Sequence, residues 1–180
     1  MNAFFLRALI SAASIPGICL FANASETAPE AIAVHDGARI ATLHAEGSQV
    51  YECKQKSEDS PSQLSALTWQ FREPVATLSS NGLSIGRHYA GPNWDYYDGS
   101  GVKGKVVASA PGATETDIPW LKLDIVEHRG RGIMSNVTAV QRINTKGGVA
   151  SGSCETAGAY SSFPIRRTTC LYGRTDKSRR

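Results

Sequence analysis

Residues 75–88 read VATLSSNGLSIGRH and carry two mainly alternating runs of apolar and polar residues on either side of Asn81-Gly82. An Asn-Gly pair suits a two-residue type I′ turn, because both central residues of that turn need a positive φ. The stretch therefore predicts a β-hairpin folded about these two residues. The expected cross-strand pairs are Leu78 with Ile85 and Val75 with His88.

Alternation with a period of two recurs along the rest of the chain and predicts further strands, because successive side chains of a strand point to opposite faces. Glycine-rich segments separate these runs and favour turns between them. The expected elements are a hairpin of 38–47 and 48–56 about Glu46-Gly47, a short strand at 68–71, a half-buried strand at 102–110, and a second hairpin of 119–128 and 133–144 about the turn at 129–132.

The alternation also predicts which side chains of these strands face the core. The expected inward residues are Val102, Gly104, Val106 and Ala108, then Leu121, Leu123 and Ile125, then Val137, Ala139 and Ile143, whereas Asn136, Thr138 and Arg142 are expected to point outward.

No long segment has the apolar spacing of an amphipathic helix, and the full chain contains 17 glycines. Polar stretches at 57–66 and 111–118 read as surface loops. About eight or nine short strands separated by such loops are typical of an antiparallel β-sandwich or barrel. The sequence therefore predicts an all-β domain with long loops.

The amino terminus predicts the compartment. Residues 1–24 combine Arg7, an apolar stretch and a small-x-small site ending at Ala24, which is the pattern of a secretory signal peptide. We expect a secreted, extracellular protein, periplasmic or at the cell surface in a bacterium, with no membrane contact after cleavage. The mature chain then has a lead at 25–37, one domain at 38–173 and a basic tail at 174–180.

The net charge and the cysteines limit which partners and cofactors are expected. Loss of Arg7 leaves the 16 acidic residues opposed by 18 basic ones, a net charge of +2, which is too balanced to favour nucleic acid. The mature chain keeps Cys53, Cys154 and Cys170, which suggests one disulfide and one remaining thiol. No C-x-x-C pair and no local histidine cluster is present, so we expect neither a metal nor another cofactor.

The aromatic segment GRHYAGPNWDYYDGSGVKGK, residues 86–105, is the richest in residues that bind ligands. Its glycines match no phosphate-binding motif. Asp98-Gly99-Ser100 reads as a turn in which the aspartate bonds its own downstream backbone. Trp94 is expected to pack inward and Tyr96 or Tyr97 to remain exposed.

The preferred functional hypothesis is a binding module for a small molecule, a carbohydrate or a peptide. Two alternatives stay open: a secreted hydrolase using His88 and Asp98, and a structural cell-surface protein. An imagined Ser100-His88-Asp98 triple has no nucleophile-elbow motif to support it. The residues expected to bind the ligand are His88, Tyr96, Tyr97, Trp120 and Arg142.

The order of several motifs resembles the secreted DUF3455 family, whose function is not established. These motifs are YEC at 51–53, HYAGPNW followed by DGS, IPWL, and QRINTKGG. The resemblance implies an all-β secreted domain and the pairing of Cys53 with Cys154, but it transfers no catalytic residue. The chain departs from the family near its end, where Arg166, Arg167 and Cys170 stand in place of β-formers and aromatics.

A glycosylation sequon is present at Asn136-Val137-Thr138. Because Asn136 is expected on the outward face of a strand, it is a candidate acceptor if the protein is made in a eukaryotic cell.

Overall fold

The computed structural model of the protein describes residues 28–55 and 66–174. The predicted signal peptide at 1–24, nearly all of the predicted loop at 57–66 and most of the predicted basic tail lie outside the described residues. Within the described ranges, no helix has the length and apolar character needed to cross a membrane.

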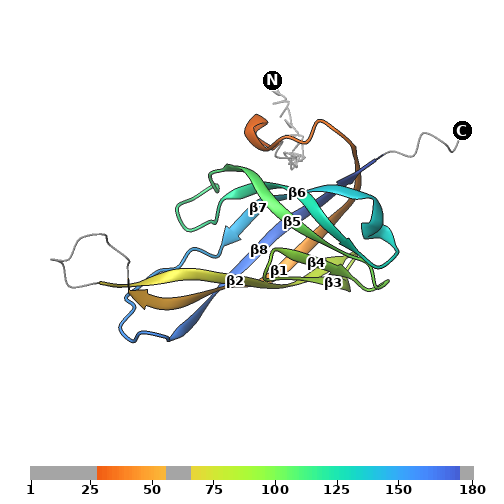
Figure 1. The fold of residues 1–180 in the computed structure, drawn as a ribbon. Coiled ribbons are helices and arrows are strands. Elements are labelled where there is room, and N and C mark those ends of the chain that lie inside the picture. Colours follow the sequence, from red (N-terminus) through yellow and green to blue (C-terminus); the bar gives the residue numbers. More distant parts are fainter. Residues whose placement is uncertain (1–27, 56–65, 175–180) are drawn as a thin grey trace, which may run out of the picture.

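In the described part of the chain, eight antiparallel strands form one sheet that closes on itself, because β1 pairs with both β2 and β8 (Figure 1). The all-β prediction is confirmed, and the described sheet is a barrel. Two short 3₁₀ turns, η1 (Glu30–Ile32) and η2 (Ile133–Asn136), accompany the strands. The strands are β1 (Ala38–Gln55), β2 (Leu67–Ser80), β3 (Leu83–Tyr89), β4 (Asn93–Tyr96), β5 (Gly101–Ala110), β6 (Trp120–Arg129), β7 (Val137–Gly147) and β8 (Tyr160–Gly173).

The hairpin predicted about Asn81-Gly82 joins β2 to β3. Both turn residues have a positive φ, 50° for Asn81 and 77° for Gly82, as a type I′ turn requires. The predicted register is wrong, because a register shift follows Leu78 and moves its partner by one residue. The observed pairs are Leu78 with Gly86 and Ala76 with His88, in place of Leu78 with Ile85 and Val75 with His88.

The hairpin predicted about Glu46-Gly47 is wrong, because β1 runs without a break through these residues. At this point β1 passes so close to β2 that a Cβ on Gly47 would collide with the carbonyl oxygen of Val75. Gly47 is therefore needed because two strands approach each other closely there, and not because the chain turns. The strand predicted at 68–71 is likewise the first part of the longer β2, and β1, β2 and β8 together extend past the short strands β3 and β4 (Figure 1).

Two layers of buried apolar side chains explain why some residues predicted to face inward point to the other side of their strand. One layer fills the barrel and includes Leu78, Trp94 and Leu123. The second lies on the outside of β5 to β8 and includes Ile32 of the amino-terminal segment, which passes over these strands (Figure 1). Both faces of β7 are therefore buried, and no simple inward and outward alternation applies. Ala139 and Ile143 belong to the outer layer, whereas Val140 and Leu171 lie in the inner one.

The disulfide predicted between Cys53 and Cys154 is present, and Cys170 is buried without a disulfide to any described residue. Val106, predicted to face inward, is 47% exposed and so is not part of the buried inner layer. Asn136 is exposed as predicted, but it lies in η2 and not on a strand.

Candidate functional site

A cavity of about 190 Å³, here called the barrel cavity, is bounded by strands β2 to β8. Phe71 and Val106 line it and are about half exposed, so they lie at its rim. Most of its walls are apolar, and the polar side chains on them are few, which is the usual composition of a small-molecule site. The lining residues are Phe71, Arg72, Pro74, His88, Gly91, Pro92, Trp94, Val106, Leu121, Leu123, Arg142, Arg167 and Thr169.

Two arginines from neighbouring strands line the barrel cavity. Arg167 of β8 is buried, and Arg142 of β7 is partly buried. Arg142 donates from Nε and Nη2 to the carbonyl oxygen of Pro119, at 3.2 and 2.6 Å. Burial, together with the charge of Arg167, lowers the pKa of Arg142 to about 9. Burial lowers the pKa of Arg167 to about 10, so both guanidinium groups remain charged at neutral pH.

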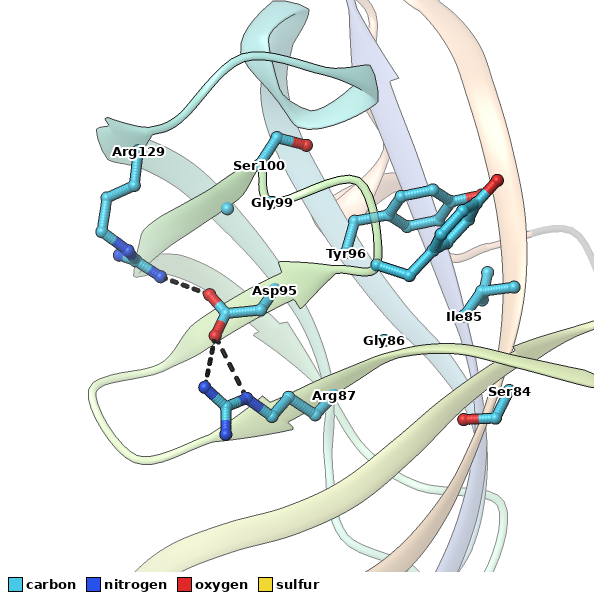
Figure 2. Close-up of a pocket in the computed structure, with 11 residues that line it drawn as sticks. Ser84, Ile85, Gly86, Arg87, Asp95, Tyr96, Gly99, Ser100 and Arg129 are labelled. Atoms are coloured by element: carbon cyan, nitrogen blue, oxygen red, sulfur yellow. Dashed lines mark hydrogen bonds and ion pairs between the residues drawn. The ribbon is translucent and has the colours of Figure 1, made fainter.

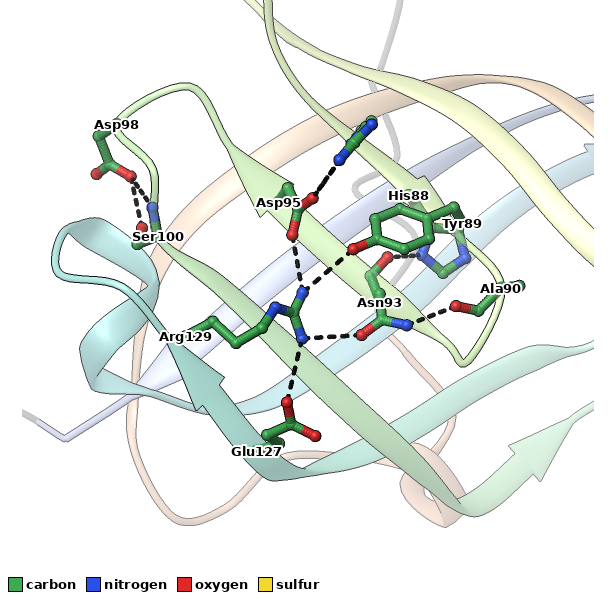
Figure 3. Close-up of polar contacts among 10 residues, drawn as sticks. His88, Tyr89, Ala90, Asn93, Asp95, Asp98, Ser100, Glu127 and Arg129 are labelled. Carbon is green, nitrogen blue, oxygen red and sulfur yellow. Dashed lines mark hydrogen bonds and ion pairs between the residues drawn. The ribbon is translucent and has the colours of Figure 1, made fainter.

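His88 is buried on the wall of the barrel cavity, where its ring stacks on Trp94 with the centroids 4.4 Å apart. Its Nδ1 lies 2.9 Å from the carbonyl oxygen of Asn93, which can only accept, so Nδ1 carries the proton (Figure 3). Burial, and then the charge of Arg167, hold the pKa of His88 well below its usual value. The imidazole is therefore neutral at pH 7.

A second and more open recess of about 620 Å³, here called the surface hollow, lies over β3, β4 and the start of β5. Figure 2 shows Asp95 of β4 between Arg87 and Arg129 in this hollow. Arg87 donates to Oδ2 of Asp95 and Arg129 to Oδ1, with nitrogen to oxygen distances of 2.9 and 2.8 Å. Burial raises the pKa of Asp95, but the hydrogen bonds from Arg129 and Arg87 outweigh it and lower that pKa overall.

The polar residues of the HYAGPNW motif build a turn and fasten it to β6. Asn93 donates from its side chain to the carbonyl oxygen of Ala90, and its Oδ1 accepts from Arg129 at 3.0 Å (Figure 3). Arg129 also lies 3.7 Å from Glu127. Arg129 of β6 thus contacts Asn93 and Asp95 of β4 as well as Glu127 of its own strand, so its role is to hold β4 against β6.

Asp98 also has a structural role. Its Oδ1 accepts from the backbone N–H and the hydroxyl of Ser100, and its Oδ2 accepts from the backbone N–H of Ile133. The hydrogen bond from Ser100 is the main cause that lowers the pKa of Asp98. The predicted Asp98-Gly99-Ser100 turn is confirmed, and it anchors η2 to the start of β5.

The residues expected to bind a ligand do not meet at one place. His88 and Arg142 line the barrel cavity, whereas Tyr96 and Tyr97 line the surface hollow. Trp120 is buried in the outer apolar layer beneath the amino-terminal segment. Trp94 packs inward and Tyr97 is 75% exposed, both as predicted.

The candidate catalytic residues are also separated. His88 bonds the carbonyl of Asn93, and Asp98 bonds Ser100 and Ile133, so the two side chains belong to different hydrogen-bond groups (Figure 3). His88 and Asp98 are not joined as a base and its orienting partner.

Arg167 is the cavity residue that sequence reasoning missed as a binding candidate. A signal for it exists in the pair Arg166-Arg167, because adjacent residues of a strand point to opposite faces. In a closed barrel one of the two must point inward. Here Arg166 is exposed and bonds Glu46, and Arg167 is the inward one.

Among residues 28–55 and 66–174, no cluster of histidine, cysteine or acidic side chains is arranged to hold a metal ion. The fold and the cavity together define a closed antiparallel β-barrel domain with a small pocket inside. The chain belongs to the DUF3455 family, proteins of unknown function, whose match covers residues 35–166. No curated protein and no solved structure gives a significant match.

Proposed function

We propose that this protein is a secreted binding module that holds a small molecule in the barrel cavity. The observation that carries the proposal is an apolar-walled cavity with buried polar groups, His88 and Arg167, on its surface. Pockets of this composition are the default ligand sites of β-barrels. The protein acts in this account by binding and not by catalysis.

The size of the barrel cavity supports a small ligand, or the end of a larger one. Its volume of about 190 Å³ is below the roughly 300 Å³ at which pockets for drug-sized ligands begin. An apolar cavity of roughly 150 Å³ is enough to hold a benzene ring. A single ring or a short chain is therefore the expected occupant, in preference to a carbohydrate or a peptide.

The surface hollow is a weaker candidate for the ligand site. The charge of Asp95 there is already met by Arg87 and Arg129. The barrel cavity, by contrast, contains buried polar atoms with no partner among the described residues, at Trp94 and Arg167. Unsatisfied buried groups are costly, so they favour the barrel cavity as the place where a ligand adds the missing contacts.

A thermal-shift screen against small organic acids, amides, alcohols, oligosaccharides and short peptides tests the proposal. Val106 lines the cavity opening, and the adjacent Val107, equally exposed at 48%, does not line the cavity. The Val106→Trp variant should block the opening and abolish the stabilisation given by a hit, and Val107→Trp should preserve it. A compound that still stabilises Val106→Trp but no longer stabilises Tyr97→Ala would bind in the surface hollow. That result would contradict the proposal.

Secretion is part of the same proposal. The amino-terminal pattern of residues 1–24 supports it, and so does the Cys53–Cys154 disulfide, because disulfides persist in oxidising compartments. Expression of the whole chain followed by amino-terminal sequencing of the exported fraction should give a protein that begins at Ser25. Recovery only in the cytosol, with residues 1–24 retained, would contradict this part.

A further inference from the structure

Two residues that line the barrel cavity have buried side-chain donors without an acceptor among the described residues. The side chain of Arg167 is only 2% exposed, and neither its Nη1 nor its Nη2 has a hydrogen-bond partner among the described residues. The indole Nε1 of Trp94, on the wall of the same cavity, is also buried without a partner. A guanidinium and an indole N–H can donate but cannot accept. A ligand that satisfies these groups must therefore supply a hydrogen-bond acceptor.

The barrel cavity also lacks negative charge. Its described lining contains three arginines and neither an aspartate nor a glutamate. Arg72, at the rim, is paired with Glu73 and lies near Glu52, so its charge is met outside the cavity. Arg142 bonds only the neutral carbonyl oxygen of Pro119 among its described partners. Two guanidinium charges thus share a partly desolvated space with no acidic side chain among its described lining residues.

Burial of an unpaired charge is expensive, and a protein normally pairs such a charge or coordinates it. The Nη1 and Nη2 groups of one guanidinium form a fork of parallel N–H bonds. The two oxygens of a carboxylate match this fork in spacing and in charge. The unsatisfied edge of Arg167 is thus suited to bind a carboxylate.

The remaining walls determine what the carboxylate is attached to. Leu121, Leu123 and the ring of Trp94 present apolar surface beside the two arginines. A bare inorganic anion would leave this surface uncovered, whereas a ring or short chain would remove it from water. Resting on the proposed function of the barrel cavity as a ligand site, we propose that the ligand is a small organic carboxylate, held by Arg167 and Arg142 and covered by these apolar side chains.

Isothermal titration calorimetry at pH 7 with benzoate, benzamide and sulfate tests this proposal. Benzoate and benzamide have the same ring and nearly the same shape but differ in charge, and sulfate carries charge without a ring. The wild-type protein should bind benzoate at least about tenfold more tightly than benzamide, because hydrogen bonds between two charged groups are among the strong ones. It should bind sulfate more weakly than benzoate by a similar factor.

Two adjacent arginines of β8 supply a matched pair of variants. Arg167→Met keeps a long side chain but removes the fork, and it should reduce the preference for benzoate over benzamide to less than about threefold. Arg166→Met removes an exposed arginine on the other face of the strand and should leave all three affinities unchanged. Arg167→Lys, which retains the charge without the fork, should lose about tenfold in benzoate affinity and covers the case in which the methionine variant does not fold.

The outcomes separate the two proposals. Equal affinities for benzoate and benzamide, both abolished by Val106→Trp, would overturn the carboxylate assignment and support the cavity as a ligand site. Sulfate binding as tight as benzoate binding would overturn the organic part of the assignment. Unchanged benzoate affinity in Arg167→Met or Arg167→Lys would remove Arg167 from the site. Absence of binding by all three compounds would overturn the carboxylate assignment, and the thermal-shift screen with Val106→Trp would then decide separately whether the cavity is a ligand site.

Discussion

Arg142 of β7 and Arg167 of β8 line the same cavity, although both side chains carry a positive charge. Neither has an acidic partner among the described residues of that cavity. Placing like charges together in a low-dielectric space destabilises the ligand-free fold. Such an arrangement is expected where a site is kept ready for a negative ligand at the expense of stability.

The cost of the buried charge can be measured directly. Replacing Arg167 with methionine should raise the free energy of unfolding of the ligand-free protein by about 1 kcal/mol or more, because an apolar side chain of similar length replaces an unpaired charge. Denaturant unfolding followed by circular dichroism gives this value. The exposed Arg166→Met control should change it by less than about 0.5 kcal/mol. A clear loss of stability in Arg167→Met would mean that its charge is compensated.

Trp94 should contribute much of the stability of the inner layer. Its side chain is 3% exposed and stacks on His88, so Trp94→Ala leaves a large void and should cost about 3 kcal/mol or more of unfolding free energy. Tyr97→Ala, at a side chain that is 75% exposed, should cost less than about 0.5 kcal/mol in the same assay. Similar losses in the two variants would contradict the assignment of Trp94 to the core.

The stability should fall as the pH drops below about 6.5. Burial and the charges of Arg167 and Arg142 lower the pKa of His88 in the folded protein, and the unfolded chain has the ordinary value near 6.5. Below that value the unfolded state binds the extra proton, so the unfolding free energy decreases by up to about 1.4 kcal/mol per pH unit. Asp95 and Asp98, whose pKa values are lowered, titrate in a more acidic range.

Unfolding measured between pH 5 and 8 tests the contribution of His88. The His88→Gln variant should remove most of this slope, because glutamine does not titrate. His35→Gln changes an exposed histidine near the amino terminus and is the matched control. An identical slope in His88→Gln and the wild-type protein would show that another group is responsible.

The Cys53–Cys154 disulfide should contribute a large part of the free energy of unfolding. Cys53 and Cys154 are separated by 101 residues, and a cross-link of that length restricts the unfolded chain strongly. The double variant Cys53→Ser and Cys154→Ser should lose about 4 to 5 kcal/mol of unfolding free energy in the chain-entropy account. Reduction of the wild-type protein should give a loss of the same size, and a loss below about 1 kcal/mol would contradict the expectation.

The sequence predicted correctly those features of the fold that depend only on neighbouring residues in the chain. The Asn81-Gly82 turn could be predicted because its backbone conformation depends on those two residues alone. The turn predicted at Gly47 was wrong. Glycine is needed there because a larger side chain would collide with the carbonyl oxygen of Val75 on another strand. The face of Arg142 was wrong for a similar reason: the sequence does not show that Ile32 covers the outside of β7, which leaves the other face to line the cavity.

The candidate site was predictable only in part. His88 and Arg142 were singled out and line the barrel cavity, whereas Tyr96 and Tyr97 lie at a different recess. Which of these residues meet depends on barrel closure and on register shifts, and neither follows from local alternation. Arg167 could have been found by asking which residue of the Arg166-Arg167 pair faces the core.

The central claim, that the barrel cavity is the ligand site, is tested most directly by nuclear magnetic resonance. In the ¹⁵N-labelled protein the indole N–H of Trp94 reports on the cavity, and that of Trp120 reports on the outer apolar layer. Titration with benzoate should move the Trp94 indole signal strongly and leave that of Trp120 in place, with the movement absent in Val106→Trp. A titration that shifts Trp120 and leaves Trp94 unchanged would contradict the account.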